Sequence, residues 1–107
     1  MKRIAIIGLG VIGASLGMAL RDARPDVEIL GSDTNAATLS KAAEMSAISR
    51  PLLNEDIGGC DIIFIATPLR AIPRVLLQMR EMLSPGTVVT DVGSVKSWVM
   101  KQYQEYL

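Results

Sequence analysis

The chain of 107 residues carries 11 acidic and 11 basic side chains, half of its residues are hydrophobic, and it contains one cysteine and no histidine. This length predicts one domain over residues 1–107, and the zero net charge argues against nucleic-acid binding. The single cysteine excludes an internal disulfide, and the missing histidine removes the commonest metal ligand, so we expect a reducing compartment such as the cytoplasm and no metal site.

The chain begins with "KRIAIIG", an apolar run that ends at glycine and predicts a buried strand over residues 2–7. "VIGASLGMALRDAR" follows with apolar residues at helical spacing, and Pro25 ends this predicted helix. Two basic residues before an uncharged run are also typical of a signal peptide or a membrane helix. The run contains four glycines, which disfavour a helix in its middle, so we expect a strand, a turn and a helix and no membrane segment.

The later segments alternate in the same way. "VEILGSD", "DIIFIAT" and "TVVTDVG" predict strands, while "NAATLSKAAEM", "PLRAIPRVLLQMREML" (residues 68–83) and "SVKSWVMKQYQEYL" predict helices. Asn35 is the expected cap of the second helix. Residues 46–59 give the weakest signal and predict a short strand and one helical turn. This alternation predicts an α/β fold, a doubly wound parallel sheet in three layers (α/β/α) of the Rossmann type.

The motif Gly8-x-Gly10-x-x-Gly13 lies directly after a predicted strand and directly before a helix. Gly8 permits a tight turn, Gly10 lets the backbone approach a pyrophosphate, and Gly13 lets the helix pack closely on the strand. The intervening residues, whose backbone N–H groups start the helix, are Leu9, Val11 and Ile12. The motif predicts a dinucleotide site at the helix N-terminus. The alternative is a set of turn glycines needed only for packing.

An acid at the end of the second strand is the next element of this fingerprint, and Asp33 lies 20 residues after Gly13. A carboxylate there accepts both hydroxyls of the adenosine ribose and repels a 2′-phosphate. Because no arginine follows it closely, we expect NAD rather than NADP. The alternative is that Asp33 caps the following helix or turn.

Two more strand ends carry special residues. Ala66, Thr67 and Pro68 follow "DIIFI", where the nicotinamide half of a dinucleotide is expected to lie, although Thr67 and Pro68 are equally consistent with a simple helix start. Arg70 is interpreted as a surface charge.

The last strand ends in "TDVGSVK", so Asp91 and Gly93 are further candidate cofactor contacts. Ser94 is suited to cap the final helix. Lys96 opposes the helix dipole in its first turn, a penalty that an anionic substrate would reverse, and it is a weaker catalytic candidate than Ser94.

Three strings, "IAIIGLGVIGASLGMAL", "DIIFIATPLRAI" and "LSPGTVVTDVGSVKSWV", together resemble the nucleotide-binding half of the prephenate and arogenate dehydrogenases of tyrosine biosynthesis. The resemblance implies an NAD(P)-dependent oxidative decarboxylation of prephenate or arogenate, with Gly8, Gly10 and Gly13 at the dinucleotide and Asp33 at its ribose. It also implies that Ser94 lies at the substrate hydroxyl and the nicotinamide. "DVGSVK" argues against the alternative of another dehydrogenase, such as a β-hydroxyacid type.

The family's helical second domain, which supplies a catalytic histidine and the homodimer contacts, is absent from these 107 residues. Since hydride transfer from an alcohol requires a base for the hydroxyl proton, we expect this chain to bind cofactor without turning over by itself. A non-catalytic nucleotide-sensing module is a further alternative. The final helix carries an apolar stripe that packs either on a partner or on its own sheet; it comprises Val95, Trp98, Val99, Tyr103 and Tyr106.

Overall fold

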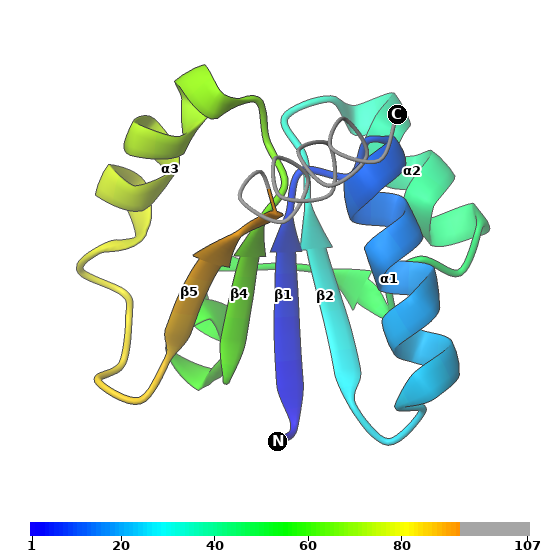
Figure 1. Cartoon of the computed structure of the whole chain (residues 1–107), viewed down its shortest axis with the longest axis horizontal. Coiled ribbons are helices and arrows are strands. Elements are labelled where there is room, and N and C mark those ends of the chain that lie inside the picture. The colour runs from blue at the N-terminus through cyan, green and yellow to red at the C-terminus, as the bar shows by residue number, and fades with distance from the viewer. Residues whose placement is uncertain (93–107) are drawn as a thin grey trace, which may run out of the picture.

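A computed structural model describes residues 1–92 and shows a five-stranded parallel sheet in the order β3-β2-β1-β4-β5 (Figure 1). The strands are β1 (Arg3–Ile7), β2 (Glu28–Ser32), β3 (Arg50–Pro51), β4 (Ile62–Ile65) and β5 (Val88–Asp91). The chain builds outward from β1 to β3 on one side and then crosses to β4 and β5 on the other. The strand order therefore reverses between β1 and β4, and in such sheets ligands bind outside the carboxyl ends of the strands at this reversal.

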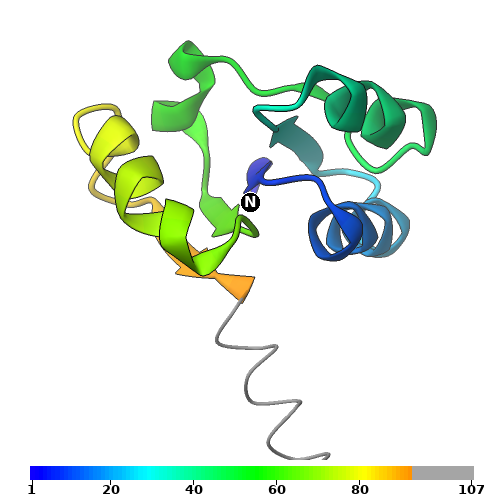
Figure 2. The ribbon, with the colours of Figure 1, turned by 90° about the horizontal axis from the view of Figure 1, so that it is seen from above.

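Helices cover both faces of the sheet, as Figure 2 shows from above. Their bounds are α1 (Val11–Ala23), α2 (Ala36–Glu44), the 3₁₀ helices η1 (Asn54–Gly59) and η2 (Leu69–Ala71), and α3 (Ile72–Met79). The helices α1 and α2 pack on one face, and η1 and α3 pack on the other. The predicted three-layer α/β/α architecture is confirmed.

Each face of the sheet has its own hydrophobic core. Ile4 and Ile6 of β1 point toward α1 and α2, whereas Ala5 between them points toward η1 and α3. Successive side chains of a strand alternate between faces, so a strand covered on both sides must be apolar throughout. This is why residues 4–7 of β1 are all apolar, and it places the first segment at the centre of the domain. No helix within residues 1–92 is long and apolar enough to cross a membrane.

Most predicted elements are confirmed. Asn35 caps α2 by accepting a hydrogen bond of 3.0 Å from the Thr38 N–H. The weak stretch between residues 46 and 59 does hold a short strand and a helical turn, β3 and η1. The predicted final helix, together with Gly93, Ser94, Lys96 and the apolar stripe, lies outside the described residues.

The prediction of one helix over residues 68–83 was wrong at both ends. Pro68 is extended (φ −55°, ψ 146°) and precedes the separate turn η2. Because Pro73 has no N–H to donate to the Leu69 carbonyl, that carbonyl accepts from the Ile72 N–H instead, in a 3₁₀ bond. The α-helix proper therefore begins at Ile72 and ends at Met79.

Candidate functional site

The glycine turn is wedged between the ends of β2 and β4. The Gly8 N–H donates to the Ser32 carbonyl at 2.8 Å, and the Ala66 N–H donates to the Ile7 carbonyl at 2.7 Å. Gly8 has a φ of +97°, and a Cβ there would lie 2.8 Å from the Ala66 backbone. A side chain at Gly8 is therefore excluded both by backbone conformation and by space.

The other two glycines of the motif have different surroundings. A Cβ on Gly13 would overlap the Gly8 carbonyl oxygen, so this glycine is required for α1 to approach the turn. A Cβ on Gly10 would meet nothing within 4 Å. Gly10 is also the N-cap of α1, and no side chain caps that helix end. The space in front of the α1 N-terminus is thus open, and its N–H groups and positive dipole end favour an anion there.

Asp33 is held by the turn that it faces. Its Oδ2 accepts from the Leu9 N–H at 2.8 Å, and its Oδ1 accepts from the Asn35 N–H at 2.8 Å. Asn35 rather than Asp33 caps α2. Of the alternative role in a cap or turn, Asp33 therefore has only the turn, through its hydrogen bond from the Asn35 N–H. Each carboxylate oxygen retains a lone pair for a ligand. Two backbone donors fix this carboxylate between the glycine turn and the end of β2.

A cleft of about 1140 Å³ opens at these strand ends. The predicted site residues that line it are Gly8, Gly10, Val11, Ile12, Asp33, Ala66, Thr67 and Pro68. Leu9 contributes its backbone N–H, while its side chain is buried in the core. Gly13 acts through packing. Asp91 ends β5, and its neighbour Val92 lines the cleft.

The Thr67 hydroxyl is an unsatisfied polar group at this site. Its oxygen is buried and has no hydrogen-bond partner within the described part of the chain. A buried hydroxyl without a partner costs roughly 1–3 kcal/mol, which a polar ligand group can recover. The open space at Gly10, the uncapped α1 N-terminus and this hydroxyl together fit a dinucleotide.

The second wall of the cleft was missed by the sequence analysis. It comes from η1 and α3, on the other face of the sheet from α1, and from the residues that flank α3. Its residues include Asn54, Ile57, Ala71, Arg74, Val75, Gln78 and Met82. Ala71, Arg74, Val75 and Gln78 lie three or four residues apart, which is the spacing of one helix face. That periodicity in the sequence could have indicated that these four residues share one face of a helix. No pattern in the sequence around η1 indicates that η1 lies beside the glycine turn.

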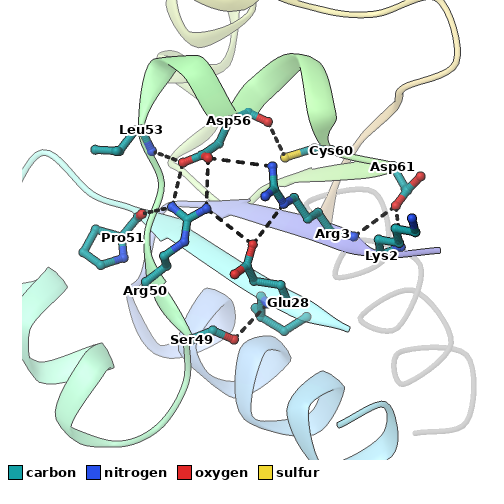
Figure 3. A network of polar contacts seen from close by, with 11 residues as sticks. Lys2, Arg3, Glu28, Ser49, Arg50, Pro51, Leu53, Asp56, Cys60 and Asp61 are labelled. Atoms are coloured by element: carbon teal, nitrogen blue, oxygen red, sulfur yellow. Dashed lines mark hydrogen bonds and ion pairs between the residues drawn. The ribbon is translucent and has the colours of Figure 1, made fainter. Parts of the chain in front are cut away.

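Below the cleft, an ion-pair network attaches η1 to the sheet (Figure 3). Arg50 donates two hydrogen bonds to Asp56, of 2.8 and 2.9 Å, and also approaches Glu28. These bonds, with the Leu53 N–H, lower the pKa of Asp56 to about 2. Burial raises the pKa of the nearby Cys60 thiol. Among residues 1–92, no group of three or more histidine, cysteine, aspartate or glutamate side chains is arranged to hold a metal ion.

Comparison with known proteins gives a family match over residues 16–107, to the nucleotide-binding domain of prephenate dehydrogenase. The prephenate dehydrogenase of Lactococcus lactis subsp. cremoris is 36% identical over 104 residues, which are 94% of this chain and 29% of that protein. The chain therefore spans about a third of the length of the proteins it matches.

Solved structures agree with this match. Synechocystis arogenate dehydrogenase is 33% identical, with a TM-score of 0.74 over 83% of this chain and 32% of that one. Prephenate dehydrogenase from A. aeolicus, solved with hydroxyphenyl propionate and NAD+, is 26% identical, with a TM-score of 0.76 over 85% of this chain and 33% of that one.

Proposed function

The chain belongs to the prephenate dehydrogenase family, within its nucleotide-binding domain, and on this basis we propose that its cleft binds NAD in preference to NADP. One observation carries the proposal: the glycine turn is closed at Gly8 and Gly13 and open at Gly10. Packing alone accounts for Gly8 and Gly13, where a side chain would clash with the backbone. It does not account for a glycine with empty space in front of it at an uncapped helix N-terminus, and a pyrophosphate does.

The preference for NAD follows from Asp33. A carboxylate held by two backbone N–H groups is fixed in position and still has lone pairs for the two hydroxyls of an adenosine ribose. A phosphate on the 2′ oxygen would remove one of these donors and bring its negative charge close to the carboxylate. Hydrogen bonds to charged groups contribute about 1.5–3 kcal/mol each, so we expect NAD to bind at least tenfold more tightly than NADP.

The remaining site residues are assigned by the same geometry and by the family. Ala66, Thr67 and Pro68 lie at the end of β4, beside the turn, and we assign them to the nicotinamide half, with the Thr67 hydroxyl donating to a ligand oxygen. Gly93 and Asp91 complete the dinucleotide contacts in this proposal. Bound NAD+ would supply the hydride acceptor.

For the reaction, we propose a dehydrogenation of prephenate or arogenate, the substrates in the relatives' names, coupled to the decarboxylation that the family resemblance implies. Ser94 is the proposed contact to the substrate hydroxyl, and Lys96 to an anionic group of the substrate. The chain contains no histidine, so it binds cofactor without completing the reaction alone. In the complete enzyme a helical domain would supply the base and the homodimer contacts. The buried, unpaired Cys60 is in keeping with a reducing compartment such as the cytoplasm.

Calorimetric titration of the chain with NAD and with NADP tests this proposal. NAD should bind more tightly, and Asp33→Asn should narrow the difference, because asparagine keeps the shape and one acceptor oxygen and removes the charge. Asp26→Asn, at an exposed ion pair with Arg24 remote from the cleft, is the matched control and should leave both affinities unchanged. Absence of NAD binding, or NADP binding as tight as NAD binding, would contradict the proposal.

A further inference from the structure

Two ionisable side chains line the described part of the cleft, and they have opposite charge. Asp33 comes from the end of β2, and Arg74 comes from α3 on the far wall. The sequence offers no arginine directly after Asp33 to receive a ribose phosphate. The fold nevertheless places Arg74, from a helix distant along the chain, on the lining of the same cleft.

Arg74 is placed against the local electrostatic preference of its helix. It lies in the first turn of α3, which contains no acidic residue, so its charge opposes the positive end of the helix dipole. Arg74 is exposed, and its side chain makes no hydrogen bond or ion pair with residues 1–92. An anionic ligand in the cleft would turn this unfavourable placement into a favourable one.

Asp33 has the opposite character. Its carboxylate is immobilised by the Leu9 and Asn35 N–H groups and cannot swing away from a ligand. A phosphate on the adenosine ribose would therefore meet a fixed negative charge on one wall. A positive charge on the other wall can offset this repulsion, because the guanidinium of Arg74, on its flexible side chain, can form a bidentate contact with a phosphate.

We propose that Arg74 is a specificity-determining residue: it contacts the 2′-phosphate of NADP and provides the residual affinity for that cofactor. This inference rests on the proposed dinucleotide site. It makes the cofactor preference a balance between two residues of opposite sign on two walls, rather than a property of Asp33 alone. It also requires that the effect of neutralising Asp33 depends on Arg74.

The test is a set of calorimetric titrations with NAD and NADP on the wild-type chain, Arg74→Gln, Asp33→Asn and the double variant. Arg80→Gln is the matched control, because Arg80 caps the end of the same helix and does not line the cleft. We expect Arg74→Gln to weaken NADP binding about tenfold and NAD binding by less than about threefold, the size of one lost charged hydrogen bond. Asp33→Asn should strengthen NADP binding, and the double variant should lose that gain.

Three results would overturn the inference: an Arg74→Gln chain that behaves like Arg80→Gln, equal losses for NAD and NADP, or an Asp33→Asn gain that survives in the double variant. Asp33→Asn with no measurable NADP binding would also reject it. If the variants fail these tests while the wild-type chain still binds NAD, the proposed function stands and only the role of Arg74 is wrong. A wild-type chain that binds neither nucleotide rejects both.

Discussion

Two alanine substitutions in the same turn should have separate effects: Gly13→Ala should lower the stability of the fold, and Gly10→Ala should weaken NAD binding. The added methyl of Gly13→Ala overlaps the Gly8 carbonyl oxygen, a backbone atom that cannot rotate away. Overpacking of this kind costs about 1–3 kcal/mol, and the better helix propensity of alanine in α1 returns about 1 kcal/mol. Because the obstacle is backbone, we expect a net loss of about 2 kcal/mol. For a domain of this size that corresponds to a fall in Tm of roughly 8–16 °C.

Gly10→Ala should behave in the opposite way. Its φ of −67° suits alanine, and the new methyl meets nothing within 4 Å. The free energy of unfolding should therefore change by less than about 1 kcal/mol, since the loss of glycine at an N-cap and the lower entropy of the unfolded chain nearly cancel. The methyl would instead occupy the proposed pyrophosphate position, so NAD affinity should fall at least about tenfold, or by 1.4 kcal/mol.

Urea or thermal unfolding measures the stability of each variant. Calorimetric titration, at a temperature where both variants are folded, measures the affinity for NAD. The reasoning is refuted if Gly13→Ala is as stable as the wild-type chain, because the close approach of α1 to the turn would then not require glycine. It is equally refuted if Gly10→Ala binds NAD normally, because the open space at Gly10 would then have no relation to the ligand.

Three further predictions concern single residues. Ser46 follows α2 in a left-handed conformation (φ 59°) while the Ala47 N–H donates to the Ala42 carbonyl, so Ser46→Gly should raise the unfolding free energy in urea by about 0.5–1 kcal/mol. Ser40→Gly, inside α2, should lower it, and a loss in both variants would contradict the assignment. Thr67→Val should stabilise the free chain by about 1 kcal/mol in urea unfolding and weaken NAD binding in calorimetry, because it removes the unsatisfied hydroxyl; a less stable variant would mean that this hydroxyl is satisfied. Because Arg50 lowers the pKa of Asp56 to about 2, the bond between them stabilises the fold above the ordinary carboxyl pKa and is lost as the pH falls from about 5 toward 2. The Tm of Asp56→Asn should be lower at neutral pH and should vary less over that range in thermal scans, and equal acid sensitivity of the two chains would exclude Asp56 as the cause.

The sequence by itself determined the parts of the site that lie close together along the chain. A buried strand, the turn Gly8–Gly13 and the following helix form one local unit, and the position of Asp33 follows from the length of a strand–helix–strand unit. Periodicity and capping residues were sufficient for these elements because their energetics depend on neighbours within a few positions, as with Asn35 at the start of α2. The same local rules overextended α3, where a proline interrupts the hydrogen bonds that helical periodicity assumes.

Only the tertiary structure decided which glycine serves the fold and which leaves space for a ligand, because Gly8, Gly10 and Gly13 differ in what surrounds them and not in their own chemistry. It also decided the second wall of the cleft. The strand order brings η1, which lies in the crossover from β3 to β4, and α3, which follows β4, to the same cleft as the glycine turn, so that Arg74 and Asp33 line one cleft. Contacts of this kind join segments whose separation along the chain carries no periodic signal, so their physical basis is the packing of the sheet rather than any local pattern.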